Sequence, residues 1–167
     1  MRLNKAILIV VATVLACGLN SCSTKKNTAG SRFWHAFNTR YNVYYNGETH
    51  YNEQIHELET KYEDNYSQLL FVHPAEAYAN PKAPQPSTNF DRTIEKMQKA
   101  IQLHSIKKRP KKKSGRLTKK DKEWLKREEY NPFLHNAWYL MAKSQYMKGD
   151  YLAAASTFHY ISGHFGW

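Results

Sequence analysis

The chain has 167 residues, a length sufficient for one domain. Hydrophobic residues make up 41% of it and aromatic residues 14%, a globular composition that argues against a disordered chain. The formal net charge is +11, but residues 107–127 alone carry twelve basic and two acidic residues. The composition therefore describes a near-neutral protein with one basic insert, not a protein that is basic throughout.

The first 21 residues have the pattern of a secretory signal peptide. Two basic residues among the first five precede an uncharged apolar run over residues 6–16, which is shorter than the roughly 20 residues of a transmembrane helix. Small residues and then a cysteine follow this run, which resembles a bacterial lipoprotein signal. Leu19-Asn20-Ser21-Cys22 fits that pattern better than the residues before Cys17, because cleavage at Cys17 would cut into the apolar run.

Cys22 is therefore the predicted site of lipid attachment and the first residue of the mature chain. Cys17 would leave with the signal, so neither an intrachain disulfide nor a C-x-x-C motif remains. Residues 22–30 are small and polar and are predicted to be a tether. No acidic residue directly follows the cysteine, which favours an outer-membrane anchor that faces the periplasm. An ordinary cleaved signal is the alternative.

An αα-hairpin is predicted over residues 31–63, the first part of an N-terminal helical region that ends at residue 106. Two sets of apolar residues repeat at steps of three and four, each typical of one helix face. The first set is Phe33, Phe37, Tyr41 and either Tyr44 or Tyr45, and the second is Tyr51, Ile55, Leu58 and Tyr62. Asn46-Gly47 between them indicates a turn.

Prolines interrupt the helical pattern over residues 64–88, where an ordered crossing or loop is predicted. The four prolines are Pro74, Pro81, Pro84 and Pro86. A helix is predicted over residues 89–106, because Ser87-Thr88-Asn89 offers N-cap side chains. The apolar stripe of this helix is Phe90, Ile94, Met97 and Ile101.

The basic insert spans residues 107–130. Pro110 and Ser114-Gly115 predict a solvated loop over its first half, and residues 119–130 are compatible with a helix whose strong apolar contacts are Trp124 and Leu125. Attraction to anionic lipid and binding of an acidic protein are two hypotheses for this segment, and a solvated loop without a partner is the third. The candidate contacts with an anionic surface are Lys111, Lys112, Lys113, Arg116, Lys119 and Lys120.

Residues 131–167 resemble a tetratricopeptide repeat, a helix–turn–helix unit. If His135 is repeat position 1, the small residues Ala142 and Ala154 fall where the two helices cross closely, and Gly149 falls in the turn. The full signature is Trp138, Met141, Ala142, Gly149, Tyr151, Ala154, Phe158 and Ile161. Gln145 departs from it, because an aromatic residue is usual there. A generic amphipathic hairpin is the alternative.

The predicted fold is therefore all-α, with helix–turn–helix hairpins of the tetratricopeptide-like α-solenoid type. A single repeat cannot bury its own apolar face, and about three are needed for stability. Only one clear repeat is present, and residue 167 follows it without a polar capping helix. We therefore expect an incomplete solenoid, the N-terminal part of a longer repeat protein.

The order of these segments resembles the front of the Bacteroidota gliding-motility lipoproteins of the SprE/PorW type. The stretches FNTRYNVYYNG (residues 37–47) and HSIKK (residues 104–108) carry the resemblance. It implies an outer-membrane scaffold linked to type IX protein secretion, which binds proteins of the envelope and needs no cofactor. A tetratricopeptide lipoprotein of β-barrel assembly is the first rival, although that family places its repeats almost directly after the anchor.

A periplasmic enzyme is the second rival, but the sequence shows no catalytic cluster, phosphate loop or nucleophile elbow. Histidines six apart (His50 and His56) and five apart (His159 and His164) do not share a helix face as an i, i+4 pair would, so no metal site is expected. Export through the signal also places the basic insert away from nucleic acid. The chain is therefore expected to be a non-enzymatic protein without a nucleic-acid or small-molecule ligand.

Overall fold

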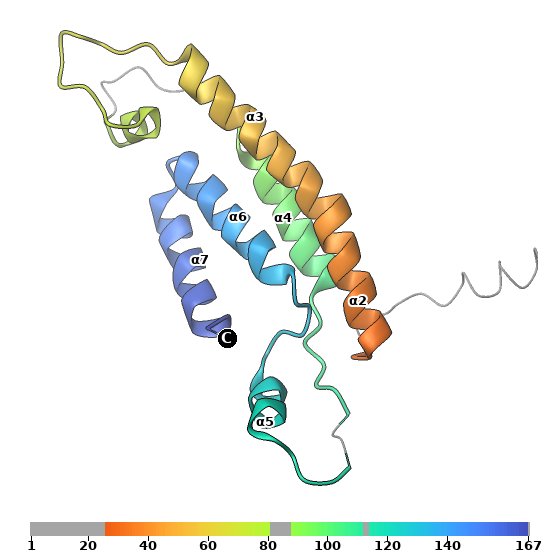
Figure 1. The fold of residues 1–167 in the computed structure, drawn as a ribbon. Coiled ribbons are helices and arrows are strands. Elements are labelled where there is room, and N and C mark those ends of the chain that lie inside the picture. The colour runs from red at the N-terminus through yellow and green to blue at the C-terminus, as the bar shows by residue number, and fades with distance from the viewer. Residues whose placement is uncertain (1–25, 81–87, 112–113, 167) are drawn as a thin grey trace, which may run out of the picture.

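The computed structural model describes residues 26–80, 88–111 and 114–166, and all regular secondary structure within them is helical (Figure 1). The all-α prediction is therefore confirmed for the described part of the chain. The elements are α2 (Ala29–Asn38), the π-helix η1 (Thr39–Tyr44), α3 (Tyr45–Lys61), the 3-10 helix η2 (Pro74–Ala79), α4 (Asp91–His104), α5 (Lys119–Lys126), α6 (Leu134–Met147) and α7 (Tyr151–His164). The predicted signal peptide, Cys22, most of the tether, Pro81, Pro84, Pro86, Lys112 and Lys113 lie outside the described residues.

One long helix replaces the hairpin predicted over residues 31–63. α2, η1 and α3 run on without a turn, and the backbone stays helical at both junctions, with φ −58° at Thr39 and φ −53° at Tyr45 (Figure 1). The prediction was wrong because Gly47 serves packing and not a turn. A Cβ on Gly47 would overlap the Cε of the buried Met97 side chain, so the missing side chain leaves room for this methyl group of α4.

The core forms where α3, α4, α6 and α7 pack on one another in that order. α4 and the residue before it, Phe90, supply the predicted stripe, in which Phe90 and Met97 are fully buried and Ile94 and Ile101 are half-buried against the cluster. The N-cap residue of α4 is Phe90, one residue later than predicted, and it makes no side-chain capping hydrogen bond. The Asn89 Oδ1 accepts a hydrogen bond of 2.9 Å from the Asp91 N–H. Tyr51 and Leu58 of α3 face the same core, as the second predicted set requires.

The described part of the crossing between α3 and α4 contains one short helix that the proline pattern did not predict. The His73 Nδ1 accepts a hydrogen bond of 3.1 Å from the Ala75 N–H and so begins η2. Ala75 and Ala77 of η2 are buried, and the Tyr151 hydroxyl donates to the Ala75 carbonyl at 3.2 Å. The crossing thereby packs against the start of α7.

Residues 134–164 form the predicted helix–turn–helix unit of α6 and α7. Gly149 lies in the turn with φ +87°, a backbone conformation that side chains disfavour. The Asp150 carboxylate then accepts a hydrogen bond of 3.4 Å from the Ala153 N–H and caps α7. Among the described residues, no helix is long and apolar enough to span a membrane.

Candidate functional site: interaction surfaces

The predicted repeat residues mostly build the contact between α6 and α7. Ala142 and Ala154 are buried, as expected for small residues at a close helix crossing. Trp138 packs on Tyr160 with ring centroids 4.5 Å apart, and Phe158 packs on Tyr139 at 5.9 Å. Met141 is also buried, whereas Ile161 is half-buried and Tyr151 is exposed at the turn. These residues therefore mainly stabilise the hairpin.

Gln145, which departs from the repeat signature, makes a polar link between the two helices. Its Oε1 accepts a hydrogen bond of 2.8 Å from the hydroxyl of Thr157, which is buried. An aromatic ring at this position would leave the buried hydroxyl with only its bond to the Ala153 carbonyl. The unusual glutamine at position 145 thus has a hydrogen-bond partner, Thr157, on the facing helix α7.

The two ends of the basic insert are joined at Glu129, a residue that the sequence did not single out. This carboxylate is buried and accepts hydrogen bonds from the backbone N–H groups of Ile106 (2.8 Å) and Asn131 (2.7 Å). It also accepts from the Ser105 hydroxyl at 2.6 Å and from the Tyr130 N–H at 2.9 Å. Four donors from both ends converge on one side chain, so the insert leaves and re-enters the helical body at a single point.

Asn131 links the junction at Glu129 to the long helix through hydrogen bonds of its side chain. Its Nδ2 donates to the Thr39 Oγ1 at 3.1 Å and to the His104 carbonyl at 2.9 Å, and all of its side chain is buried. The Tyr130 N–H also donates to the Ile106 carbonyl at 3.0 Å. Residues 107–128 therefore leave the helical body as one excursion. The residues on either side of it, Ile106 and Glu129 to Asn131, form its base and are held in place by these hydrogen bonds.

The helical half of the insert is shorter than predicted. α5 ends at Lys126 because Arg127 is extended (φ −61°, ψ 148°) and leads into the junction at Glu129. Thr118 and Asp121 begin α5 with a reciprocal capping box. Trp124 is half-buried between the Tyr130 ring, 5.5 Å away between centroids, and the Arg32 guanidinium, 5.0 Å from the ring centroid.

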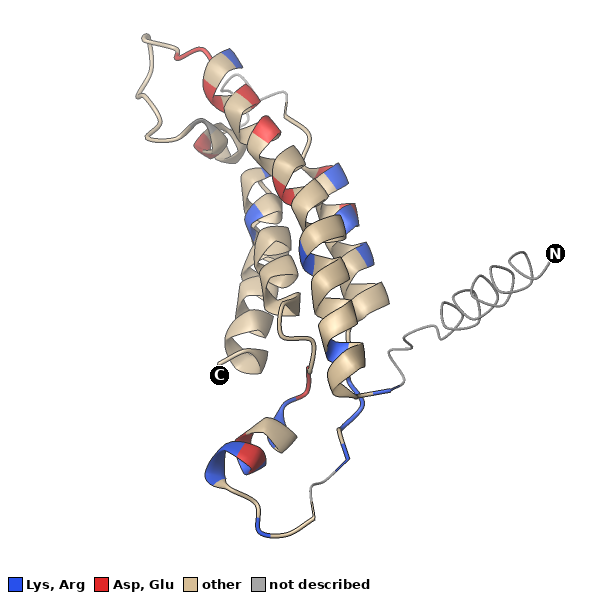
Figure 2. Cartoon of the chain, turned by 45° about the vertical axis from the view of Figure 1, so that its right-hand side comes forward, with Lys and Arg blue, Asp and Glu red and all other residues tan. Residues whose placement is uncertain are grey.

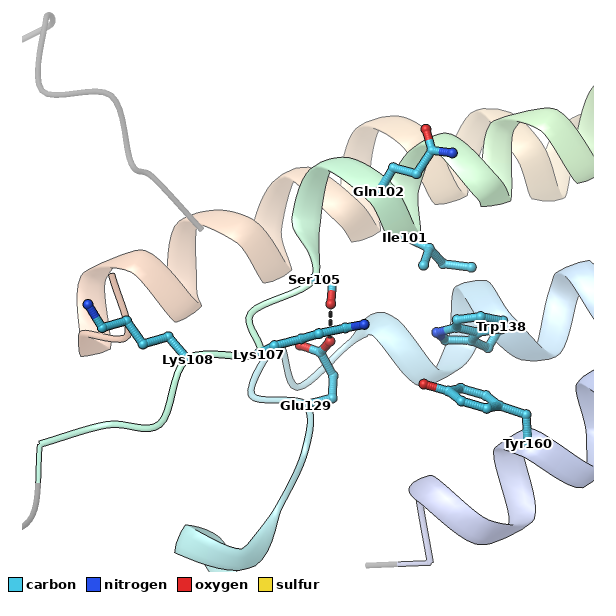
Figure 3. Close-up of a pocket in the computed structure, with 8 residues that line it drawn as sticks. All are labelled: Ile101, Gln102, Ser105, Lys107, Lys108, Glu129, Trp138 and Tyr160. Atoms are coloured by element: carbon cyan, nitrogen blue, oxygen red, sulfur yellow. Dashed lines mark hydrogen bonds between the residues drawn. The ribbon is translucent and has the colours of Figure 1, made fainter. Parts of the chain in front are cut away.

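A groove lies between the base of the insert and the α6–α7 hairpin (Figure 3). The rings of Trp138 and Tyr160 point into it from one side, and Lys107 extends toward them from the other. Burial and the nearby carboxylates of Glu128 and Glu129 raise the pKa of the Tyr160 hydroxyl, which keeps it neutral. The Ser105 hydroxyl donates to a carboxylate that also holds three backbone N–H groups, so this pair has a structural role.

The histidines do not gather into a metal site. Within the described residues, no group of three or more His, Cys, Asp or Glu side chains could hold a metal ion. His35 and His104 meet with their Nδ1 atoms 3.0 Å apart, and this contact between α2 and α4 was not predicted. Two histidines from the spacings considered above have other partners: His50 contacts Thr93 at 3.0 Å, and His164 contacts Glu128 at 3.1 Å.

An exposed row of aromatic rings, here called the aromatic stripe, runs along the long helix. It consists of Phe33, Phe37, Tyr41 and Tyr45, which are 71%, 48%, 58% and 61% exposed. The first three rings are in contact, with 6.0 Å between the centroids of Phe33 and Phe37 and 4.9 Å between those of Phe37 and Tyr41. The sequence spacing identified the stripe, but not that it faces outward.

The opposite face of the same helix is polar and points inward. Ser31, His35 and Thr39 are buried there, and the Thr39 hydroxyl donates to the His35 carbonyl at 2.6 Å and accepts from Asn131. These hydrogen bonds hold the polar face against the body of the protein. The apolar face of α2 and η1 is consequently left to solvent.

Comparison with protein-family models, with curated proteins and with solved structures finds no significant match to this chain. A proposal for the function of this protein therefore has to rest on its surfaces, in particular the aromatic stripe and the basic insert.

Proposed function

We propose that this protein is a non-enzymatic scaffold, attached through acylated Cys22 to the outer membrane and facing the periplasm. It acts through protein–protein contacts in gliding motility and type IX protein secretion. The observation that carries the scaffold role is the aromatic stripe on the long helix, because it offers a rigid apolar surface that is not used within the described part of the chain.

The aromatic stripe has the properties of a protein-binding surface. Aromatic residues are enriched where proteins meet, and contiguous exposed apolar patches mark such sites. Burial of one large apolar side chain contributes about 1.5–3 kcal/mol, so covering several of these rings is a substantial driving force. The stripe lies on helical backbone that Thr39 and Asn131 fasten to the core, so little conformational entropy is lost on binding.

The finer fold assignment is part of the same proposal. We assign α6 and α7 to a tetratricopeptide-like repeat, and α3, α4, α6 and α7 to the beginning of an α-solenoid. The repeat spacing, the buried alanines and the turn at Gly149 support the repeat. The successive packing of α3 on α4, α4 on α6 and α6 on α7 supports the stacking of a solenoid.

The link to motility and secretion rests on the sequence stretches at residues 37–47 and 104–108. Part of the first stretch coincides with the aromatic stripe, since Phe37, Tyr41 and Tyr45 belong to both. The second covers His104, whose carbonyl accepts from Asn131 at the base of the insert. The partner is thus proposed to be an envelope protein of the secretion or motility machinery.

Photo-crosslinking in living cells tests the proposal. A photoreactive amino acid replaces Phe37 or, as a matched control on the same long helix, the exposed Asn52 of α3. We expect a crosslinked adduct from Phe37 that contains a secretion or motility component, and none from Asn52. Equal adducts from both positions, or an adduct from Phe37 that contains only proteins unrelated to these machineries, would contradict the proposal.

The anchor is tested separately in the same strains with a radioactive fatty acid. The wild-type protein is expected to carry the label, and Cys22→Ala is expected to lose it. Labelling that persists in Cys22→Ala and disappears in Cys17→Ala would show that the other cysteine is acylated.

A further inference from the structure

We propose that the end of the molecule formed by the start of α2 and the basic insert is a docking surface for the anionic lipid head groups of the membrane that holds the chain. This inference rests on the proposed membrane anchoring but concerns a different surface from the aromatic stripe. It assigns the insert a binding partner, and it assigns the molecule an orientation on the membrane.

A hollow at this end, here called the basic hollow, gathers cations from three separate segments. Lys26 comes from the tether, Arg32 from α2, and three more basic side chains come from the insert. The lining residues are Lys26, Asn27, Thr28, Ala29, Arg32, Lys108, Arg109, Pro110, Lys111 and Trp124. Five of them are basic and none is acidic, so a negatively charged group is attracted to the hollow without a competing carboxylate in its lining.

Hydrogen bonds hold the hollow together. The Asn27 Nδ2 donates to the Lys108 carbonyl at 2.7 Å, which joins the tether to the insert across 81 residues of sequence. The Arg32 Nη1 donates to the Asn27 Oδ1 at 2.6 Å while its guanidinium lies over the Trp124 ring. The arginine is thus oriented before binding, and its planar group suits the geometry of a phosphate.

The start of α2 adds to the positive potential. Thr28 caps this helix by accepting from the Ser31 N–H at 3.1 Å, and Asn27, Thr28 and Ala29 all line the hollow. The N-terminal end of a helix dipole favours anions. The dipole therefore reinforces the side-chain charges of Lys26 and Arg32.

Charge is distributed unevenly along the whole molecule (Figure 2). Residues 107–127 carry twelve basic and two acidic residues, whereas residues 45–80 carry seven acidic and one basic residue. Figure 2 shows α5 and its flanking loop at one end of the molecule, and the C-terminal end of α3 with the crossing that follows at the other. An anionic surface attracts the first end and repels the second, so it orients the molecule as well as binding it.

The tether selects a membrane rather than another anionic partner. Cys22 lies four residues before Lys26, a length that covers at most about 14 Å in any conformation. An acyl group on Cys22 would therefore keep the basic hollow close to the lipid surface. Such tethering gives the head groups a high effective concentration at the hollow, which a freely diffusing acidic protein does not have.

The test uses the full-length protein, reconstituted into vesicles, with a fluorophore attached at Ser114 through a genetically encoded azide. Energy transfer to an acceptor on the lipid head groups reports the distance of the insert from the membrane. We expect stronger transfer in vesicles that contain phosphatidylglycerol than in vesicles of phosphatidylcholine alone. Raising the salt from about 0.1 M to about 1 M shortens the Debye length from about 10 Å to about 3 Å and should abolish the difference.

Two variants with the same change in net charge localise the effect. Lys108→Gln, Arg109→Gln and Lys111→Gln together remove three charges of the basic hollow, and the transfer should fall to the phosphatidylcholine level. Arg92→Gln, Lys96→Gln and Lys99→Gln remove three charges from α4, and the difference between vesicles should persist. A fluorophore at the exposed Ser67, in the acidic half of the molecule, should show weaker transfer than one at Ser114.

Several results would overturn the proposal. Energy transfer from Ser114 that is equal in both kinds of vesicle would do so, and so would an equal loss of transfer in the two triple variants. Stronger energy transfer from Ser67 than from Ser114 would also contradict it. Binding of polyglutamate without any response to phosphatidylglycerol would assign the surface to an acidic protein instead. Mass spectrometry of the reconstituted protein shows whether Cys22 is acylated, so a failure of the anchor is distinguished from a failure of the docking surface.

Discussion

Gly149 and Gly47 show that one residue type can serve two different purposes in this chain. Gly149 has φ +87° in the turn between α6 and α7, whereas Gly47 lies in a regular helix and leaves room for Met97. Sequence pattern identified the first, because Gly-Asp between two helical segments is typical of a turn. It misread the second, because the partner of Gly47 lies fifty residues away on α4.

We expect Gly149→Ala to destabilise the protein. An alanine here adopts left-handed backbone at a cost of about 1–2 kcal/mol, and its Cβ would also lie 2.8 Å from the Cβ of Tyr78. Gly115→Ala is the matched control, since Gly115 has φ +98° but nothing within 4 Å of the added Cβ. Urea unfolding should show a larger loss at Gly149, and equal losses would mean that the contact with Tyr78 contributes nothing.

Glu129 is a second residue whose importance lies in its partners. Glu129→Ala removes the acceptor of the buried Ile106 and Asn131 N–H groups. An unsatisfied buried donor costs about 1–3 kcal/mol, so we expect a loss of about 3 kcal/mol in the free energy of unfolding. Glu128→Ala should cost about 1 kcal/mol or less, because Glu128 is exposed and pairs with His164 at the surface.

Hydrogen exchange gives the decisive measurement for Glu129. The Ile106 and Asn131 amides should exchange faster in Glu129→Ala and at the wild-type rate in Glu128→Ala. If both amides keep their wild-type protection in Glu129→Ala, the carboxylate does not hold the base of the insert.

At the scale of elements, the long helix is the largest difference between prediction and structure. Spacing of apolar residues predicted helices on both sides of Asn46-Gly47, and both are present. The spacing could not decide whether they fold back or run on, because that depends on the contact of α3 with α4. It also could not show that the first apolar set faces solvent, since Asn131 and His104 hold the polar face of α2 and η1 from distant parts of the chain.

The contact between α2 and α4 is expected to depend on pH. Burial lowers the pKa of His104, and the neighbouring His35 lowers it further. Burial also lowers the pKa values of His50 and His135. These side chains bind protons more readily in the unfolded chain than in the folded protein, so the free energy of unfolding should fall as the pH drops below about 6.5.

Urea unfolding at pH 7.5 and pH 5.5 checks this expectation. His104→Gln should reduce the loss between the two pH values, because it removes one of the groups that must be protonated at a buried site. His56→Gln, which replaces an exposed ring of α3, is the control. An unchanged loss in His104→Gln would show that the contact with His35 has no part in the pH dependence.

For the whole molecule, sequence pattern predicted more of the helices than of their arrangement. The all-α class, the stripe of α4 and the α6–α7 hairpin were all predictable, because each depends on neighbours within a few turns. The junction at Glu129, the basic hollow and the contact of Tyr151 with η2 were not, because each joins segments that are distant in sequence. Of the two surfaces proposed to bind partners, the basic hollow belongs to this second group, whereas the spacing of the aromatic stripe was visible in the sequence and only its exposure was not.

The rigid base of residues 107–128 also has an evolutionary consequence. The Ile106 carbonyl and the Tyr130 N–H are joined by a hydrogen bond of 3.0 Å, so the chain enters and leaves the excursion at nearly the same place. A short linker in place of the excursion would leave the path of the chain through α4 and α6 unchanged. The insert is thus an exchangeable module, and most of the positive charge of the protein can be gained, lost or retuned without rebuilding the core.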